Sequence, residues 1–514
     1  MQKNIVIAHD VGTSSVKSAL VDSTGNIMGE STHRYPIYYP QPGWVEQDPI
    51  DYWNAIVANT KKLVTKIDST KILGIVFTTQ AQGVIPVNKS GKVLRKNIIW
   101  VDGRAEEEAR WLMGLFGGRA AFKSFLGIEI TGKDVIPKLR WLKHKESEIY
   151  NNAHKILDVN GYLRLKATGD MAIEWSGASS WGFNVKKKDW EHLFFRAAGF
   201  DRQKLPKLIR SIDVAGHLTK EAAAEFGLDK TVPVFGGCDD SQSAAVGAGC
   251  VRDGEVFAYI GTAAQIGAIS AKAIKFRNGA ACLQSADPAR NLMIGVTESA
   301  GNNVEWLISK FYKKELDEVG KEEIFKILNK EAEEVPPGSD HLIFTPWFLG
   351  ERCPVSTTTT RGTIFNIGLE HSRGHFIRAL FEGIGYNLRW IIENYEKDFK
   401  FKIPEFKFIG GGSQNDLWMQ TVADITGRKV VTTNQPTMAG AIGAAMCAFV
   451  GSGIFRDFTE VDKIVSVHKT FKPNTTNKKI YDKLFTNYKD VYKSLKGTYQ
   501  RANAKRFTIQ EQYQ

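Results

Sequence analysis

The hydrophobic pattern at the start of the chain predicts two strands joined by a tight turn. Apolar residues dominate positions 5–8 and 16–21, and the small residues at 12–15 between them are typical of turns. Apolar side chains at helical spacing follow over residues 50–67, and the run at 72–79 predicts another strand. The opening of the chain therefore indicates a mixed α/β fold.

The same pattern recurs about half a chain later. A strand-like run at 255–260 leads into Gly261-Thr262-Ala263-Ala264, and a second apolar run follows at 266–270. Two copies of strand, Gly-Thr turn and strand predict two halves built on one supersecondary unit, facing each other across a cleft. The boundary is expected just after Gly249 or Cys250.

The rest of the second half alternates predicted helices with short strands. The helices are expected at 303–312, 321–333 and 373–394, and the strands at 342–344 and 406–409. Beyond residue 461 the chain is polar and rich in lysine, with one amphipathic helix at 478–495. Because 514 residues exceed one hydrophobic core, we predict domains at 1–250 and 251–455, and a helical tail at 456–514 packed on the second domain.

Composition narrows the function class. Hydrophobic residues make up 43% and charged residues 24% of the chain, as in an ordinary globular protein. The five cysteines are scattered without a Cys-x-x-Cys pair, and no apolar run approaches the roughly 20 residues of a membrane span. The net charge of +12 comes from dispersed lysines. We therefore expect a cytoplasmic protein with neither a nucleic-acid nor a membrane partner.

Two turns carry candidate phosphate chemistry. Asp10 ends the first predicted strand, and Lys17 follows the turn Gly12-Thr13-Ser14-Ser15. Backbone N–H groups of such a turn can approach phosphate oxygens, and the carboxylate can hold Mg²⁺ through water. The spacing is not that of a Walker A loop, and a plain hairpin turn is the alternative. The second turn at Gly261-Thr262 favours the phosphate interpretation, because ATP held between two halves needs one turn from each.

A third glycine cluster, Gly410-Gly411-Gly412, ends a predicted strand and is followed by Ser413 and a helix at 417–425. Its flat surface can contact adenine or ribose, although a flexible loop is the alternative.

Two adjacent acids, Asp239 and Asp240, lie where a strand meets a small-residue helix. Either carboxylate can accept a proton from a substrate hydroxyl as that hydroxyl attacks a γ-phosphate. Either can also simply cap the helix.

Together these motifs resemble the FGGY family of carbohydrate kinases, within the actin-like, ribonuclease-H-like ATPase superfamily. The resemblance covers roughly residues 4 to 455 and adds further motifs in the order of the family, namely Gly43 to Pro49, Trp100 to Ala105, Gly350 to Pro354, Arg361-Gly362, Phe381 to Gly383 and Gln420 to Asp424. It implies two duplicated ribonuclease-H-like domains with a catalytic cleft between them.

The resemblance also implies roles for individual residues. Asp240 becomes the catalytic base, since it stands seven residues before Gly247, and Asp10 helps to bind magnesium. The implied ATP-binding residues are Asp10, Gly12, Thr13, Ser14, Lys17, Gly261, Thr262, Gly410, Gly411, Gly412, Ser413 and Asn415. The implied substrate residues are Gln80, Ala81, Gln82, Asp102, Arg104, Asp240 and Ser241.

The sequence departs from the family at Ala81-Gln82, where xylulokinases typically have Met-His and glycerol kinases Arg-Glu. The motif Trp100-Val101-Asp102-Gly103-Arg104 is closer to the xylulokinase branch. We therefore expect an ATP- and Mg²⁺-dependent kinase of a ketopentose such as xylulose. Another pentulose, a hexulose, a polyol or gluconate is the alternative, followed by an actin-like or chaperone-like ATPase or an inactive sugar sensor. A homodimer is compatible with the resemblance.

Overall fold

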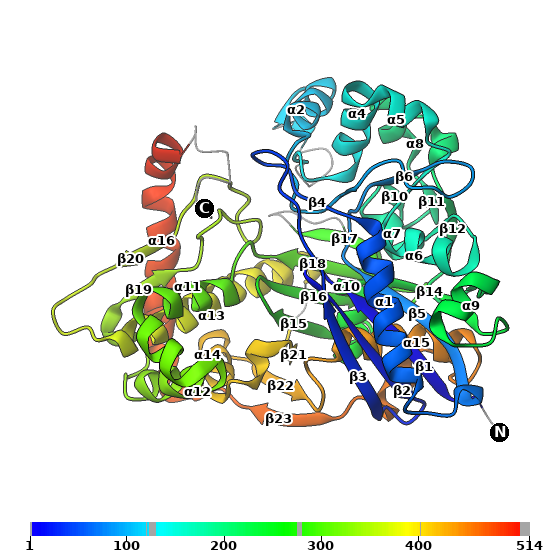
Figure 1. The fold of residues 1–514 in the computed structure, drawn as a ribbon. Helices are drawn as coiled ribbons and strands as arrows, with labels where there is room; N and C mark the ends of the chain where they lie inside the picture. Colours follow the sequence, from blue (N-terminus) through cyan, green and yellow to red (C-terminus); the bar gives the residue numbers. More distant parts are fainter. Residues whose placement is uncertain (1–2, 120, 123–129, 275–279, 401, 504–514) are drawn as a thin grey trace.

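A computed structural model describes residues 3–119, 121–122, 130–274, 280–400 and 402–503. It contains two large mixed sheets, one in each half of the chain (Figure 1). We refer to residues up to Gly247 as the first half and to residues from Val256 as the second half. The first sheet has the order β13-β14-β5-β1-β2-β3, with strands Val214–His217, Pro233–Asp239, Ile72–Thr79, Ile5–Val11, Ser15–Asp22 and Ile27–Arg34.

The second sheet has the order β17-β18-β16-β15-β21-β22-β23. Its strands are Ala281–Gln284, Asn291–Val296, Ala264–Ser270, Val256–Ile260, Glu405–Ile409, Lys429–Thr433 and Val467–Phe471. Short two-stranded pairs complete the strands: β4 Glu46–Gln47 with β7 Asn97–Ile98, β6 Ile85–Val87 with β8 Lys155–Leu157, β9 Ala172–Glu174 with β12 Lys207–Ile209, β10 Phe183–Asn184 with β11 Asp189–Trp190, and β19 Ile343–Thr345 with β20 Thr363–Phe365.

The two sheets share one topology. In the first, β1 pairs antiparallel with β2 and parallel with β5, and β5 continues in parallel to β14. In the second, β15 pairs antiparallel with β16 and parallel with β21, and β21 continues in parallel to β22. An antiparallel strand then closes each sheet on that side. The predicted duplication of an α/β unit is confirmed.

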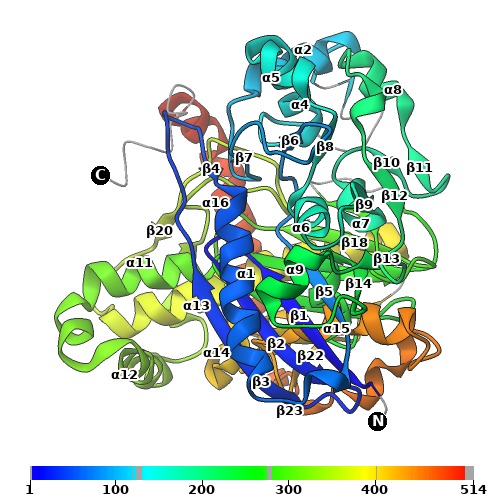
Figure 2. The same cartoon turned by 45° about the vertical axis from the view of Figure 1, so that its right-hand side comes forward.

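Two helices join the halves. Helix α10, Asp240–Gly247, ends the first half, but its alanines pack with Phe257 and Leu292 of the second sheet. Helix α15, Ala439–Gly451, ends the second half and packs on Val6 and Val76 of the first sheet. Figure 2 shows α15 beside β1, β2 and β5. Each half therefore contributes a helix to the core of the other.

The remaining helices cover the sheets and form a cap on the first half. The cap and the first sheet carry α1 Pro49–Val64, α2 Glu106–Leu115, α4 Val135–Lys145, α5 Ser147–Asn152, α6 Val159–Thr168, α7 Trp175–Ser179, α8 His192–Ala197 and α9 Lys220–Phe226. The second half carries α11 Gly301–Phe311, α12 Lys313–Glu333, α13 Arg373–Phe399, α14 Asp416–Thr426 and α16 Lys478–Asn503. Short 3₁₀ helices lie at Ser69–Lys71, Arg202–Lys204, Ser339–His341, Gly411–Gln414, Phe458–Lys463 and Thr475–Asn477.

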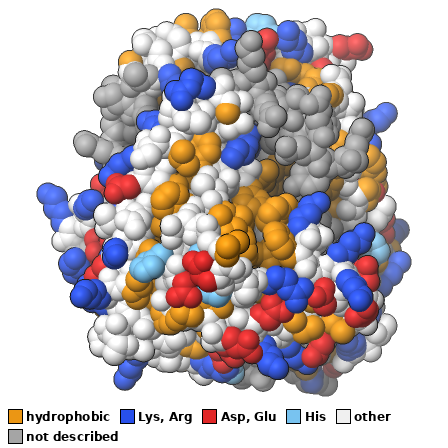
Figure 3. All heavy atoms as spheres, turned by 90° about the vertical axis from the view of Figure 1, so that its left-hand side faces the viewer, with side chains coloured by type: hydrophobic (Ala, Val, Ile, Leu, Met, Phe, Trp, Pro, Cys, Tyr) orange, Lys and Arg blue, Asp and Glu red, His pale blue; other side chains and the backbone are white. Residues whose placement is uncertain are grey.

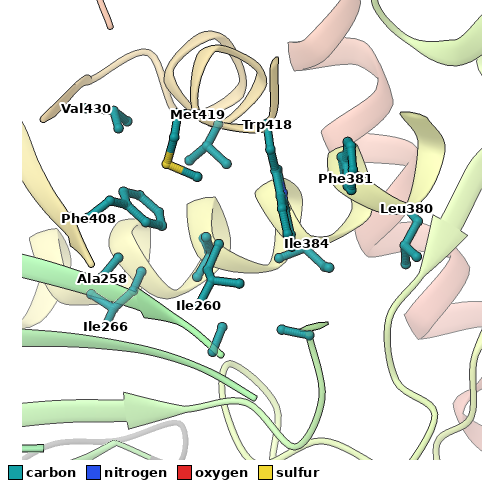
Figure 4. Packing of buried hydrophobic residues seen from close by; sticks show 14 of the residues in the cluster. Ala258, Ile260, Ile266, Leu380, Phe381, Ile384, Phe408, Trp418, Met419 and Val430 are labelled. Atoms are coloured by element: carbon teal, nitrogen blue, oxygen red, sulfur yellow. The ribbon is translucent and has the colours of Figure 1, made fainter. Parts of the chain in front are cut away.

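The core of the second half lies between its sheet and α13 and α14. Phe381 of α13 stacks on Trp418 of α14, with ring centroids 4.6 Å apart, and Ile260 of β15 belongs to the same cluster (Figure 4). Packing of these apolar side chains fixes the glycine turn between β21 and α14.

The C-terminal region differs from the prediction in one respect. The helix expected at 478–495 is present as α16 and extends to Asn503. However, the segment before it, expected to be helical, contributes strand β23, which pairs with β22. The first four residues of this strand are exposed and only Phe471 is half-buried, so the sequence lacks the alternation of apolar and polar residues that predicts a strand.

Candidate active site

The proposed base lies at the junction of the two halves. Asp240 is the first residue of α10, directly after β14. Its side chain reaches solvent, yet protein atoms crowd around it and the resulting desolvation raises the pKa of its carboxyl. Ser241 Oγ lies 3.1 Å from Asp240 Oδ1 and 3.1 Å from Oε1 of Gln265, which belongs to the second sheet. The acid is therefore in contact with both halves.

Asp240 influences the ionisation of Asp10. Burial, and then the charge of Asp240, raise the pKa of Asp10 to about 6, while Lys17 opposes the shift. Asp10 pairs across the hairpin with Lys17. Its carboxylate lies against the start of α15, where a Cβ at Gly440 would lie 2.6 Å from Asp10 Oδ2. The structure thus brings the two predicted acids together from opposite ends of the first half.

The first glycine turn is held tightly. Gly12 N–H donates to the Ser15 carbonyl at 3.0 Å. The Thr13 carbonyl accepts from Gln47 Nε2 at 2.6 Å, and the Thr13 hydroxyl accepts from Trp100 Nε1 at 3.0 Å. Ser14 and Lys17 are exposed. These contacts fix the orientation of Thr13, whose hydroxyl still has its own O–H to donate to a phosphate.

The second glycine turn is fixed in a similar way. Gly261 donates its N–H to the Ala263 carbonyl at 3.0 Å, and its own carbonyl accepts from Gly301 at 2.9 Å. The Thr262 carbonyl accepts from Ala300 at 3.0 Å, and its side chain is exposed. Both turns therefore present small, exposed residues between two strands, as the repeat predicted.

The third glycine cluster begins at Gly410, whose φ of +88° requires glycine. The Gly410 carbonyl accepts from Ser413 Oγ at 2.7 Å. Asn415 caps α14 by accepting from Trp418 N–H at 3.0 Å, and its Nδ2 donates to Asn329 at 2.6 Å. Because both ends of the Asn415 side chain are engaged, its role in this structure is that of a helix cap.

Asp239 lies among buried acids. Glu174 and Asp158 approach it around Gly177, where a Cβ would lie 2.9 Å from Asp158 Oδ2 and 3.4 Å from Asp239 Oδ1. Both of these oxygens are buried without a hydrogen-bond partner. Burial, followed by the charges of Glu174 and Asp158, raises the pKa of Asp239 well above its usual range. Asp239 is therefore held protonated, which distinguishes it chemically from Asp240. Among the described residues, no group of three or more acids, histidines or cysteines is arranged to hold a metal ion.

The predicted sugar residues at 80–82 lie after β5. Gln80 is buried and donates to Gln47 Oε1 at 2.7 Å, which connects this strand end to the first glycine turn. Gln82 is half-buried, has a φ of +62°, and places its Nε2 3.4 Å from Asp134 Oδ1. Ala81 between them is half-buried. Of the three, Gln82 has the polar side chain nearest to solvent.

Asp102 and Arg104, which were expected near the substrate, form a buried pair in the structure. Asp102 is fully buried, and Arg104 donates to it through Nε and Nη2. The Arg104 side chain is also fully buried, pairs with Glu46 at 2.7 Å and stacks on Trp44 with 3.8 Å to the ring centroid. Closed off from solvent, this pair holds two loops together, since Asp102 also accepts from the Val45 N–H.

Several residues near the site carried no signal of their own in the sequence. Gln265 lies at the start of β16, three residues after Thr262 of the second turn, and Gln47 connects two motifs. Lys138 is buried beside Asp102 and donates to the Ile99 carbonyl at 2.8 Å, and burial lowers its pKa to about 7. Only the tertiary fold shows their proximity, because each belongs to a different segment.

Comparison with known proteins identifies the family. Residues 5–247 match the N-terminal domain of the FGGY family of carbohydrate kinases, and residues 256–452 match the C-terminal domain. No described helix is long and apolar enough to cross a membrane.

The chain is 30% identical over 497 residues to a protein of Bacillus subtilis named xylulose kinase, covering 95% of this chain and 96% of the relative. A gluconokinase of the same organism is 26% identical, covering 95% and 96%. The solved structure of xylulose kinase from Rhodospirillum rubrum is 28% identical and superposes with a TM-score of 0.86, covering 96% of this chain and all of that one. The chain belongs to the FGGY family of carbohydrate kinases and is a sugar-phosphorylating enzyme.

Proposed function

We propose that this protein transfers the γ-phosphoryl group of ATP to a hydroxyl of a ketopentose such as xylulose, with Asp240 as general base. The observation that carries the proposal is the position of Asp240 at the junction of the two halves, reaching solvent beside Asp10 and in contact with Gln265 through Ser241. An exposed carboxylate with a raised pKa is suited to accept a proton near neutral pH.

In this reaction the sugar hydroxyl oxygen forms the new bond to the γ-phosphorus as ADP leaves. Asp240 accepts the hydroxyl proton. The turns at Gly12-Thr13 and Gly261-Thr262 hold phosphate oxygens through backbone N–H groups, with Lys17 nearby, and the cluster at Gly410 to Ser413 contacts the nucleoside. Gln82 binds the sugar by hydrogen bonds, and approach of the two halves excludes water. Alignment of the two reactants supplies on the order of 7–11 kcal/mol of barrier reduction.

The acids present fit a magnesium ion. The charge of Asp240 raises the cost of ionising Asp10 in a crowded site, which a divalent cation would relieve. One or two carboxylates together with substrate phosphates are the usual Mg²⁺ ligands, so a full protein cage is not required. Asp10 would hold the ion, which supplies charge neutralisation on the phosphates when bound.

The relatives favour a ketopentose over other substrates, since the proteins named xylulose kinase have the higher identities. Gluconate is the second candidate, because a gluconokinase is also similar over nearly the whole chain. The family match favours a kinase over an actin-like ATPase or an inactive sensor. The five cysteines are all free, which supports the cytoplasmic location expected from the sequence. A homodimer remains an expectation.

Two measurements test the proposal. Coupled ADP release is measured with xylulose, ribulose, fructose, glycerol, xylitol and gluconate, and xylulose is expected to give the highest kcat/KM. In the second measurement, Asp240→Asn is expected to lower kcat by about 10²–10⁴-fold while ATP affinity is retained.

The matched control is Asp239→Asn. Because Asp239 is held protonated, its neutral isostere is expected to keep turnover within a few fold of the unchanged enzyme. Turnover of Asp240→Asn equal to that of the unchanged enzyme would overturn the assignment of the base. If a compound other than a ketopentose gave the highest kcat/KM, the proposed substrate would be wrong.

A further inference from the structure

Opposite charges meet where the cap of the first half faces the second half. Lys133 Nζ, just before α4, lies 3.7 Å from Glu298 Oε2, which follows β18 of the second sheet. Arg352 binds the other oxygen of Glu298 through Nε at 3.1 Å and Nη2 at 3.0 Å. Although burial alone would lower the pKa of Arg352, the charge of Glu298 and then that of Asp134 raise it. Lys133 of the first half therefore forms one ion-pair set with Glu298 and Arg352 of the second half, and the charge of Asp134 acts on Arg352 from beside it.

The second-half members of this set are held rigidly. The buried carboxyl of Glu351 accepts the backbone N–H of Glu298 and that of Arg352, both at 2.9 Å. Its other oxygen accepts from Asn387 Nδ2 at 2.8 Å. Three hydrogen bonds to this one carboxyl hold two segments together that are 54 residues apart in the sequence. The Glu298 and Arg352 side chains are thus presented to the cap in a defined orientation.

The first-half members are connected to the proposed sugar site. Asp134 precedes α4, and its Oδ2 accepts from Thr131 N–H at 2.7 Å. Its Oδ1 lies 3.4 Å from Nε2 of Gln82, the proposed sugar residue. A change in the distance between the halves therefore acts on the residue that holds Gln82.

The set is also connected to the proposed base. Glu298 stands two residues after Val296, which pairs with Gln265 in the second sheet. Gln265 Oε1 lies within hydrogen-bond distance of Ser241, next to Asp240. The ion-pair set is therefore linked through neighbouring residues to Gln82 on one side and to Asp240 on the other.

We propose that Lys133 and Asp134 of the cap, with Glu298 and Arg352 of the second half, form a latch that holds the two halves in the closed arrangement and positions Gln82 for the sugar. This inference rests on the proposed function, because the latch acts on the sugar side of that site. The four side chains are positioning residues: they hold the site together without taking part in proton or phosphoryl transfer. Charges that are partly buried and paired from opposite halves favour the closed arrangement more than exposed pairs do.

A double-mutant cycle tests the latch in catalysis. Lys133→Met and Glu298→Gln are each expected to raise the KM for the sugar by roughly 2- to 10-fold, and the double variant no further than the stronger single variant, because both remove the same contact. The KM for ATP is expected to rise less than the KM for the sugar, because Asp134 contacts Gln82 on the sugar side, whereas a general loss of structure would raise both. The matched control is Lys187→Met, which removes an exposed pair with Glu191 at 3.8 Å within the first half and should leave both KM values unchanged.

A measurement that does not depend on catalysis tests the latch independently of the proposed kinase activity. Glu298→Lys places three cations together at the interface, and small-angle X-ray scattering is expected to give a larger radius of gyration than for the unchanged protein. Glu298→Gln is expected to show a smaller increase and serves if the reversal variant does not fold. Equal radii for all three proteins would overturn the latch, as would additive effects in the cycle. Absence of sugar phosphorylation by the unchanged enzyme would overturn the proposed function alone.

Discussion

At the scale of single residues, one buried carboxyl is unusual in its protonation. Burial raises the pKa of Glu351 to about 8, although the N–H groups of Glu298 and Arg352 and the amide of Asn387 oppose the shift. Near neutral pH this carboxyl is therefore protonated in the folded protein and ionised in the unfolded chain. Glu351 therefore supports the latch, but its effect on the free energy of unfolding depends on pH.

This difference makes stability depend on pH in a defined direction. Between about pH 4.5 and pH 8 the unfolded chain releases a proton that the folded protein keeps, so the free energy of unfolding falls as pH rises. The Glu351 contribution between pH 5.5 and 7.5 is expected to be about 2–3 kcal/mol.

Urea denaturation of the unchanged protein and of Glu351→Gln over this pH range measures the contribution. Glutamine keeps one oxygen for the two backbone N–H groups but does not titrate, so the variant is expected to show a flatter dependence on pH, whatever its absolute stability. Parallel curves for the two proteins would contradict the assigned protonation.

At the scale of elements, the crossing of α10 and α15 controls how the halves meet. The two helices approach so closely that a Cβ at Gly247 would lie 1.9 Å from the Ala439 carbonyl oxygen, and one at Gly443 would lie 1.9 Å from the Ser243 carbonyl oxygen. Only glycine permits such contact between backbones. The crossing places the start of α15 against Gly247, at the end of α10, and Gly440 against Asp10 of β1.

A methyl group at this crossing should separate the helices. Gly443→Ala is expected to lower the free energy of unfolding by about 1–3 kcal/mol, because neighbouring backbone must move. The same substitution at Gly114, in α2, meets no atom within 4 Å and should be neutral or stabilising by up to about 1 kcal/mol. Thermal unfolding of both variants measures the difference, and equal effects would refute the close approach as the cause.

At the scale of the whole molecule, α16 supports the second half from its outer side. Tyr481, Leu484, Phe485 and Tyr488 of this helix are buried, and Tyr488 packs against Trp347 with ring centroids 5.1 Å apart. The Tyr488 hydroxyl lies 3.2 Å from Asn387 Oδ1, and Asn387 in turn binds Glu351. The last described helix is thus linked through two residues to the carboxyl behind the latch. The face of the molecule shown in Figure 3 carries hydrophobic side chains interspersed with charged ones.

Loss of this support should destabilise the protein. Tyr488→Ala is expected to reduce the free energy of unfolding by about 3–5 kcal/mol, as for other large-to-small substitutions of buried aromatic residues. Lys496→Ala, on the exposed side of the same helix, should change it by less than about 0.5 kcal/mol. Denaturant titration of the two variants gives the comparison. A Tyr488→Ala variant as stable as Lys496→Ala would show that α16 is dispensable for stability.

The sequence alone predicted the duplicated α/β architecture and the strand positions around both glycine turns. These features follow from local signals, namely apolar periodicity, turn chemistry and family motifs, each contained in a short segment.

Only the tertiary structure decided which polar groups meet. Asp102 and Arg104 stand in a recognisable motif, yet the fold buries them as a pair, while Lys133 and Glu298 are 165 residues apart and meet at the interface. The exchange of α10 and α15 between the halves likewise depends on glycine contacts that no local pattern specifies. Periodicity determines which face of an element is buried, whereas partners across a junction depend on how whole elements pack.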